Sequence, residues 1–210
     1  MTEKYFLDYN RIRDNIDLKI SEILSFYITD VKTDVKTDVK TDVLCKKGCC
    51  GCCTAITLFP VEFFAIKQEI ERMRFGNLAK TLALSDFKNT KEGDGCIFLE
   101  KSICMIYEAR PIICRTQGLP LLYFSDKLEE YTITFCEKNF SSRNEDFEFD
   151  TEYAIDLDRL NSSLYKLNKE FIEEINPGLK ADKRIQMSLL LSGNISGNKD
   201  YKIPSLYFNE

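Results

Sequence analysis

The sequence predicts an α+β fold that is predominantly helical, with helices packed around a small cysteine-rich metal centre and a short β-hairpin. Apolar residues recur every three or four positions over residues 5–27 and 156–175, which is typical of amphipathic helices. Five of the nine cysteines lie within residues 45–53. Two short apolar runs, residues 96–99 and 103–107, flank a charged turn and predict the hairpin.

The first helix is expected over residues 5–27, with its apolar stripe facing the core. Residues 29–43 then repeat the sequence Thr-Asp-Val-Lys. This four-residue period places like charges one helical turn apart, which disfavours a helix, and the same pattern is too long for an unpaired edge strand. We interpret the repeat as a spacer that carries no chemistry.

Short elements are expected after the cysteine-rich segment. Residues 54–58 are rich in β-branched side chains and predict a strand, and Pro60 suits the first turn of a helix that extends to Met73. Residues 78–84 predict one or two further helical turns. Residues 91–95 are charged and rich in glycine, and they predict a loop.

The second half of the chain is expected to alternate in the same way. Residues 108–115 begin with a helical turn, residues 131–136 predict a strand, and residues 140–151 predict an acidic loop. A strong amphipathic helix follows over residues 156–175, where an Asn-Pro-Gly sequence stops it. One more short helix is expected over residues 185–191.

These elements suggest one domain built from four segments. They are an N-terminal helix (1–28), the spacer (29–43), a metal-binding core (44–140), and a C-terminal helical segment that packs on this core (141–210). A chain of 210 residues suits a single domain of this kind.

Composition and charge narrow the classes of function. The 29 basic and 34 acidic residues are mixed along the chain, with a net charge of −5, so we expect no nucleic-acid partner. No apolar run approaches the roughly 18 residues of a transmembrane helix, and the charged N-terminus is unlike a signal peptide. We therefore expect a cytoplasmic protein without a membrane partner.

The cysteines favour a metal over disulfides. The cytosol keeps thiols reduced, and an odd number of cysteines that includes two adjacent pairs suits chelation better than a disulfide framework. Thiolates are soft donors that select zinc, copper(I) and iron–sulfur clusters. The chain contains no histidine, which excludes histidine-containing zinc fingers and His-based catalytic triads. We expect zinc or an iron–sulfur cluster, bound through thiolates.

The spacing of the cysteines resembles that of a known family. The resemblance rests on Cys45-x3-Cys49-x2-Cys52-Cys53, on Cys96-Ile97-Phe98-Leu99, and on the segment CMIYEARPIICR from Cys104 to Arg115. The chain resembles the CxxCxxCC, or YkgJ-like, family of small bacterial proteins, which is named for zinc or iron chelation. Cys50 is an additional cysteine in that pattern, and the repeat before the cluster is another departure from it.

The resemblance implies a ligand set that omits Cys50. The implied metal ligands are Cys45, Cys49, Cys52, Cys53, Cys96, Cys104, Cys114 and Cys136. Eight ligands suffice for one site or for two, and we expect both cysteine groups to contribute to a metal that is structural for the fold. Adjacent cysteines rarely point at one metal, because successive side chains diverge along an extended backbone.

Two arginines flank Cys114 and are candidates for compensating the charge of the site. A metal or cluster held by four thiolates is negatively charged, and the guanidinium groups of Arg110 and Arg115 would offset that charge and donate to sulfur. Alternatively, Arg110 caps a turn or pairs with Glu108.

The leading hypothesis is a metal- or cluster-binding protein, and an enzyme is the alternative. Some members of the family are flagellin lysine N-methylases, so the resemblance implies a metal-dependent methylase that acts on a protein substrate with S-adenosylmethionine. The sequence lacks the glycine-rich turn of a Rossmann-type methyltransferase. Cys45-x3-Cys49-x2-Cys52 also matches the radical S-adenosylmethionine motif, but Gly51 replaces its usual aromatic residue and the βα repeats of a barrel are missing.

Overall fold

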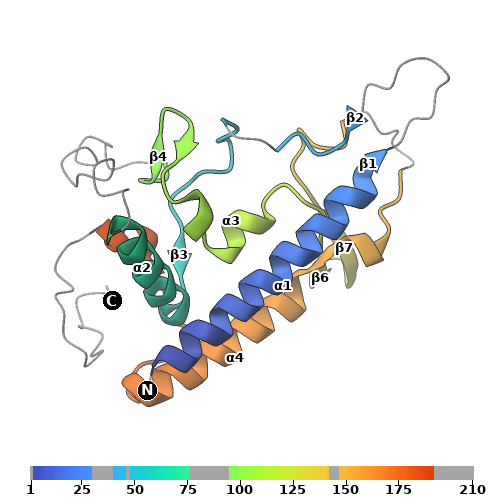
Figure 1. Cartoon of the computed structure of the whole chain (residues 1–210). Helices are drawn as coiled ribbons and strands as arrows, with labels where there is room; N and C mark the ends of the chain where they lie inside the picture. Colours follow the sequence, from blue (N-terminus) through green and yellow to red (C-terminus); the bar gives the residue numbers. More distant parts are fainter. Residues whose placement is uncertain (1, 30–39, 46–47, 76–94, 142–146, 192–210) are drawn as a thin grey trace. The chain divides into compact units, whose positions relative to one another are not determined.

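The computed structural model describes residues 2–29, 40–45, 48–75, 95–141 and 147–191 (Figure 1). It is 50% helix and 14% strand, with small sheets and a cysteine-rich stretch, so the predominantly helical α+β fold is confirmed. The helical turns predicted over residues 78–84 lie outside the described residues, as does most of the loop predicted over residues 91–95.

The chain divides into two compact units, which we describe separately. Unit 1 comprises Met1–Arg11, Lys47–Pro111 and Ser163–Glu210, and unit 2 comprises Ile12–Lys46 and Ile112–Ser162. The division of the sequence into four segments of one domain stays a prediction.

Helix α1 (Glu3–Tyr27) confirms the first predicted helix. Its first turns contribute buried Phe6 and Tyr9 to unit 1, and its last turns contribute buried Ile23 and Tyr27 to unit 2. These positions follow the apolar stripe of the sequence, because side chains three or four residues apart share one face of a helix.

The core of unit 1 forms around helix α2 (Pro60–Phe75) and the second half of helix α4 (Leu157–Ile175). Phe171 of α4 is fully buried, and its ring lies 5.6 Å from that of Tyr5, 5.8 Å from that of Phe6 and 6.2 Å from that of Phe64. Aromatic rings at such distances combine large buried area with favourable edge contacts.

Two small antiparallel sheets complete unit 1. Strand β3 (Thr57–Leu58) pairs with β9 (Ile185–Gln186), which continues into the 3-10 helix η5 (Met187–Leu191). The predicted strand at residues 54–58 is therefore shorter than expected. The predicted helix at residues 185–191 begins instead as a strand, since its first residues pair with β3.

The predicted hairpin is confirmed in a shorter form, as β4 (Leu99–Glu100) paired with β5 (Ile103–Cys104). Its two connecting residues, Lys101 and Ser102, both have positive φ angles, 46° and 63°. Two such residues in succession indicate a type I′ turn, the geometry that matches the twist of the flanking strands. The segment then continues through η3 (Tyr107–Ala109).

Unit 2 contains helix α3 (Ile112–Thr116) and a three-stranded sheet. Strand β7 (Glu130–Thr134) corresponds to the predicted strand at residues 131–136, and it pairs antiparallel with β6 (Leu121–Ser125). Strand β8 (Ile155–Asp156) pairs parallel with the other edge of β6. The sequence analysis missed β6, although its run of four large apolar residues before a polar turn is a strand signal.

Helix α4 confirms the second predicted long helix. Asp156 precedes it, and its carboxylate accepts the main-chain N–H of Arg159 at 2.8 Å, which is the usual cap of a helix start. A short 3-10 helix, η4 (Thr151–Tyr153), lies before β8.

The two ends of the repeat lie in unit 2. Strands β1 (Ile28–Thr29) and β2 (Lys40–Thr41) pair antiparallel, and residues 30–39 between them lie outside the described residues. Asp42 and Val43 are buried, and the Asp42 carbonyl accepts the N–H of Phe140 at 2.8 Å. The last residues of the predicted spacer thus pack in the core of unit 2.

Among the described residues, none of the helices is both long enough and apolar enough to cross a membrane.

Candidate metal centre

Six of the cysteines belong to unit 1, and main-chain hydrogen bonds join the two segments that carry them. The N–H of Cys53 donates to the carbonyl of Cys50 at 3.0 Å and so folds the first segment into a turn. The N–H of Cys96 then donates to the carbonyl of Cys53 at 3.1 Å. This second bond brings the chain just before the hairpin beside residues 50–53, although the two lie more than 40 positions apart.

Cys53 is the thiol at the centre of this arrangement. Burial, the largest cause, and then the charges of Cys52, Cys96, Cys104 and Cys50 together raise its pKa to about 11. Four other cysteines therefore lie within electrostatic reach of Cys53. At neutral pH the Cys53 thiol keeps its proton, and a cation that binds this sulfur must displace it.

Two of these thiols share a main-chain motif. Burial raises the pKa of Cys96, whereas a hydrogen bond from the main chain of Phe98 lowers it. Burial likewise raises the pKa of Cys104, whereas a hydrogen bond from the main chain of Ile106 lowers it. In both cases the residue two positions ahead donates to the sulfur, which favours the charged thiolate.

Arg110 acts electrostatically on this group, because its positive charge also lowers the pKa of Cys104. The guanidinium group lies 3.5 Å from the centre of the Tyr107 ring, and its Nε donates to the Tyr107 carbonyl at 2.9 Å. The side chain therefore does close a turn, as the alternative interpretation held, while its charge also acts on a cysteine.

Arg115 has a different environment, in unit 2. Its Nη1 lies 2.8 Å and 3.0 Å from the two carboxylate oxygens of Asp17 on α1. The side chain of Arg115 is 8% exposed, whereas that of Asp17 is 43% exposed. The guanidinium of Arg115 is thus held by a carboxylate.

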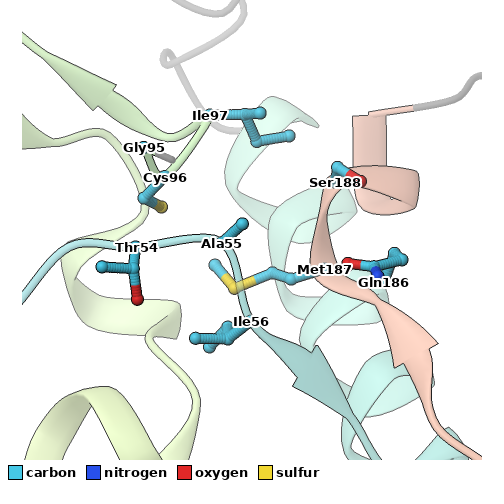
Figure 2. Close-up of a pocket in the computed structure, with 9 residues that line it drawn as sticks. All are labelled: Thr54, Ala55, Ile56, Gly95, Cys96, Ile97, Gln186, Met187 and Ser188. Atoms are coloured by element: carbon cyan, nitrogen blue, oxygen red, sulfur yellow. The ribbon is translucent and has the colours of Figure 1, made fainter. Parts of the chain in front are cut away.

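A small pocket opens beside Cys96 in unit 1 (Figure 2). It lies between residues 54–56, residues 95–97 and residues 186–188, and Cys96 and Met187 both line it. The Cys96 side chain therefore borders open space on one side.

The other three cysteines, Cys45, Cys114 and Cys136, belong to unit 2. Cys114 is half-buried within α3. Cys45 and Cys136 both lie against Gly118: a Cβ added to this glycine would meet the Cys45 Sγ at 2.5 Å and the Cys136 Cβ at 3.7 Å. The amide of Asn139 donates to the same Cys45 sulfur at 3.4 Å.

The structure brings the predicted ligands together only in part. Cys49 and Cys52 are exposed, and the Cys50 sulfur lies 3.7 Å from the Ser102 hydroxyl. Among the described residues, no three Cys, Asp or Glu side chains already lie close enough to hold a metal ion. The donors fit a thiophilic metal in type and number, and several side chains must turn inward to bind one.

The sequence analysis did not single out Asn139, Gly118 or Ser102, which contact the cysteines. A single asparagine, glycine or serine carries no local signal, and each of these contacts joins residues far apart in the chain.

Comparisons with known proteins agree with the spacing of the cysteines. Residues 44–141 match the model of the CxxCxxCC family, described as "Putative zinc- or iron-chelating domain". Neither the curated proteins nor the solved structures include a match to the chain. The matched segment contains all nine cysteines, and the resemblance inferred from the sequence is confirmed. Residues 44–141 of this chain are therefore similar to the CxxCxxCC family of zinc- or iron-chelating domains.

Proposed function

We propose that this protein binds zinc or an iron–sulfur cluster through cysteine thiolates, and that the thiols of unit 1 form the principal site. The proposed ligands in unit 1 are Cys49, Cys52, Cys53, Cys96 and Cys104. Cys45, Cys114 and Cys136 are the proposed ligands in unit 2.

The observation that carries this proposal is the environment of Cys53. Its pKa of about 11 reflects a sulfur that is partly removed from water and lies within electrostatic reach of four other cysteines. Several thiolates at such a place would repel one another, and a cation among them removes that cost. A bound zinc ion would supply a closed structural site, and a bound iron–sulfur cluster would supply a redox-active one.

The surroundings of the cluster suit thiolate ligands. The main-chain donors of Phe98 and Ile106 and the positive charge of Arg110 all stabilise negative sulfur. Metal-bound thiolates commonly accept such hydrogen bonds from the groups around them.

Methyl transfer to a protein remains the alternative that the family resemblance implies. It would require S-adenosylmethionine and a protein substrate in addition to the metal, and it would keep the cysteine site as its metal centre.

The test is the metal content of protein purified without oxygen, together with its absorption spectrum. We expect stoichiometric zinc in colourless protein, or iron with a broad absorption in the visible range. Cys49→Ser, Cys52→Ser and Cys53→Ser should each lose most of this metal, because each removes a proposed ligand.

Cys50→Ser is the matched control, since Cys50 lies in the same segment and its sulfur faces the Ser102 hydroxyl. It should keep its metal. Equal loss in Cys50→Ser would overturn the ligand assignment, and a wild-type protein without zinc or iron would overturn the proposed function.

A further inference from the structure

We infer that Asn139 is a positioning residue for Cys45, whose sulfur it holds through an N–H···S hydrogen bond, and that it thereby prepares this thiol to bind a metal. The inference rests on the proposed function in treating Cys45 as a metal ligand. The position of the Cys45 sulfur does not depend on the proposed function. All the residues involved belong to unit 2.

The orientation of the Asn139 amide is determined by its main-chain partners. Its Oδ1 accepts the N–H of Leu44 at 2.9 Å, and its Nδ2 donates to the carbonyl oxygen of Gly118. The opposite orientation would place the Nδ2 donor against the Leu44 N–H, and the Oδ1 acceptor against the Gly118 carbonyl oxygen. The amide nitrogen therefore lies 3.4 Å from the Cys45 sulfur and donates to it, and the thiol in turn lies 3.8 Å from Oδ1.

Asn139 is also rigidly placed, because only 1% of its surface is exposed. Its own N–H donates to the carbonyl of Cys136 at 2.8 Å. One buried residue thus joins the segment of Leu44 and Cys45, the turn at Gly118 and the segment of Cys136.

Gly118 leaves room for the sulfur that Asn139 holds. Its φ angle is +91°, a conformation that favours glycine, and a Cβ at this position would lie 2.5 Å from the Cys45 sulfur. Any larger residue would displace the sulfur or the turn. The backbone conformation at residue 118 and the space that the Cys45 sulfur occupies therefore both favour glycine at this position.

An amide N–H that points at sulfur has a specific chemical effect. It stabilises negative charge on the sulfur, as a thiolate ligand carries, and it reduces the number of side-chain orientations that the ligand must abandon on binding. Removing such a supporting hydrogen bond typically lowers metal affinity by roughly 10- to 100-fold.

The test is Asn139→Asp, which keeps an acceptor for the Leu44 N–H and replaces the donor near sulfur by a carboxylate oxygen. Alkylation by iodoacetamide, followed residue by residue with mass spectrometry, reports on each cysteine in the full chain. In metal-free protein we expect Cys45 of this variant to react roughly tenfold more slowly. With added Zn²⁺, we expect the zinc concentration that protects Cys45 to rise roughly 10- to 100-fold.

Asn168→Asp is the matched control. Asn168 is an equally buried asparagine of unit 1, and it also accepts a main-chain N–H and donates to a main-chain carbonyl, but the structure places it on no sulfur. It should leave the alkylation of Cys45 unchanged.

Gly118→Ala provides a second variant, which retains Asn139 and displaces the Cys45 sulfur by steric contact. This variant should also weaken the protection of Cys45 by zinc.

Wild-type alkylation and wild-type zinc protection of Cys45 in folded Asn139→Asp would overturn the inference. An equal change in Asn168→Asp would also overturn it, because the effect would then be general destabilisation. Hydrogen exchange over strands β6 and β7 in unit 2 and over helix α2 in unit 1 establishes that each variant is folded. If zinc protects no cysteine of the wild-type protein and the purified protein contains no iron, the proposed function fails, and the rates in metal-free protein still decide the role of Asn139.

Discussion

Each unit contains a buried asparagine that ties separate main-chain segments together, and only one of these two residues touches a cysteine. Asn168 in unit 1 accepts the N–H of Val61 at 3.1 Å and donates to the carbonyl of Ala181 at 2.8 Å. Asn139 in unit 2 makes the equivalent pair of contacts and adds the sulfur of Cys45. The same structural device therefore supports packing in one unit and positions a thiol in the other.

The cysteines of the two units also differ in which groups act on their sulfur atoms. In unit 1 the sulfurs act on one another, and main-chain N–H groups and Arg110 stabilise them. In unit 2 the Cys45 sulfur is placed by one side chain and by the space at Gly118. In the first unit, neighbouring thiolates would repel one another without a cation to neutralise them, whereas the second unit prepares a single thiol.

The largest effect is expected from Cys104→Ser compared with Cys114→Ser, one cysteine in each unit. Structural zinc contributes on the order of 10 kcal/mol in small domains, so loss of the Cys104 thiolate should expose residues 48–53 to hydrogen exchange. We expect a smaller change there in Cys114→Ser. Equal loss of protection in both variants would break the comparison, because Cys114 would then support residues 48–53 as strongly as Cys104 does.

A second comparison concerns the two aromatic cores. Phe171 is fully buried in unit 1, and Phe140 is buried in unit 2 among Tyr27, Phe135 and Phe149 at ring distances of 4.9 to 5.4 Å. Phe171→Ala and Phe140→Ala should each lower the free energy of unfolding by about 3–5 kcal/mol. Denaturation measured by circular dichroism gives the values, and hydrogen exchange shows where protection is lost. A loss below about 1 kcal/mol would show that the packing of that unit is looser than described.

A smaller effect should separate the end of the repeat from its interior. Val43→Ala removes two buried methyl groups and should cost about 1.5–2 kcal/mol. Deletion of residues 29–40, which removes three copies of the repeat, should change stability by less than about 0.5 kcal/mol, because a two-residue strand pair contributes little. Thermal unfolding and metal content check both variants. A collapse of either quantity on deletion would show that the repeat packs on unit 2.

The smallest effect is a pH dependence in unit 1. The Tyr5 hydroxyl and then Lys4 lower the pKa of Glu174, and the Tyr5 oxygen lies 2.8 Å from its carboxylate. Because the folded-state pKa is lower than the unfolded one, this contribution is present above about pH 4.3 and is lost as pH falls through the folded value. The urea midpoints of wild type and Tyr5→Phe should therefore differ at pH 7 and converge near pH 3. A constant difference would assign the effect to packing alone.

Local sequence determined the elements whose signals are short in range. The long helices follow from apolar spacing, the stop after residue 175 follows from Asn-Pro-Gly, and the hairpin follows from two apolar runs around a turn. Very short strands were less predictable: β9 replaced the start of an expected helix because Ile185 and Gln186 pair with β3. Tertiary pairing outweighs local propensity in elements of two residues.

The sequence by itself also determined the donor chemistry, since nine cysteines, no histidine and the family spacing indicate a thiophilic metal. Only the tertiary structure decided which sulfurs lie together and what holds them. Cys53 meets Cys96 through a main-chain hydrogen bond, Arg115 is held by Asp17, and Asn139 reaches Cys45 across 94 positions of sequence. Such contacts depend on packing between distant segments, and no local pattern encodes the partner of a single asparagine.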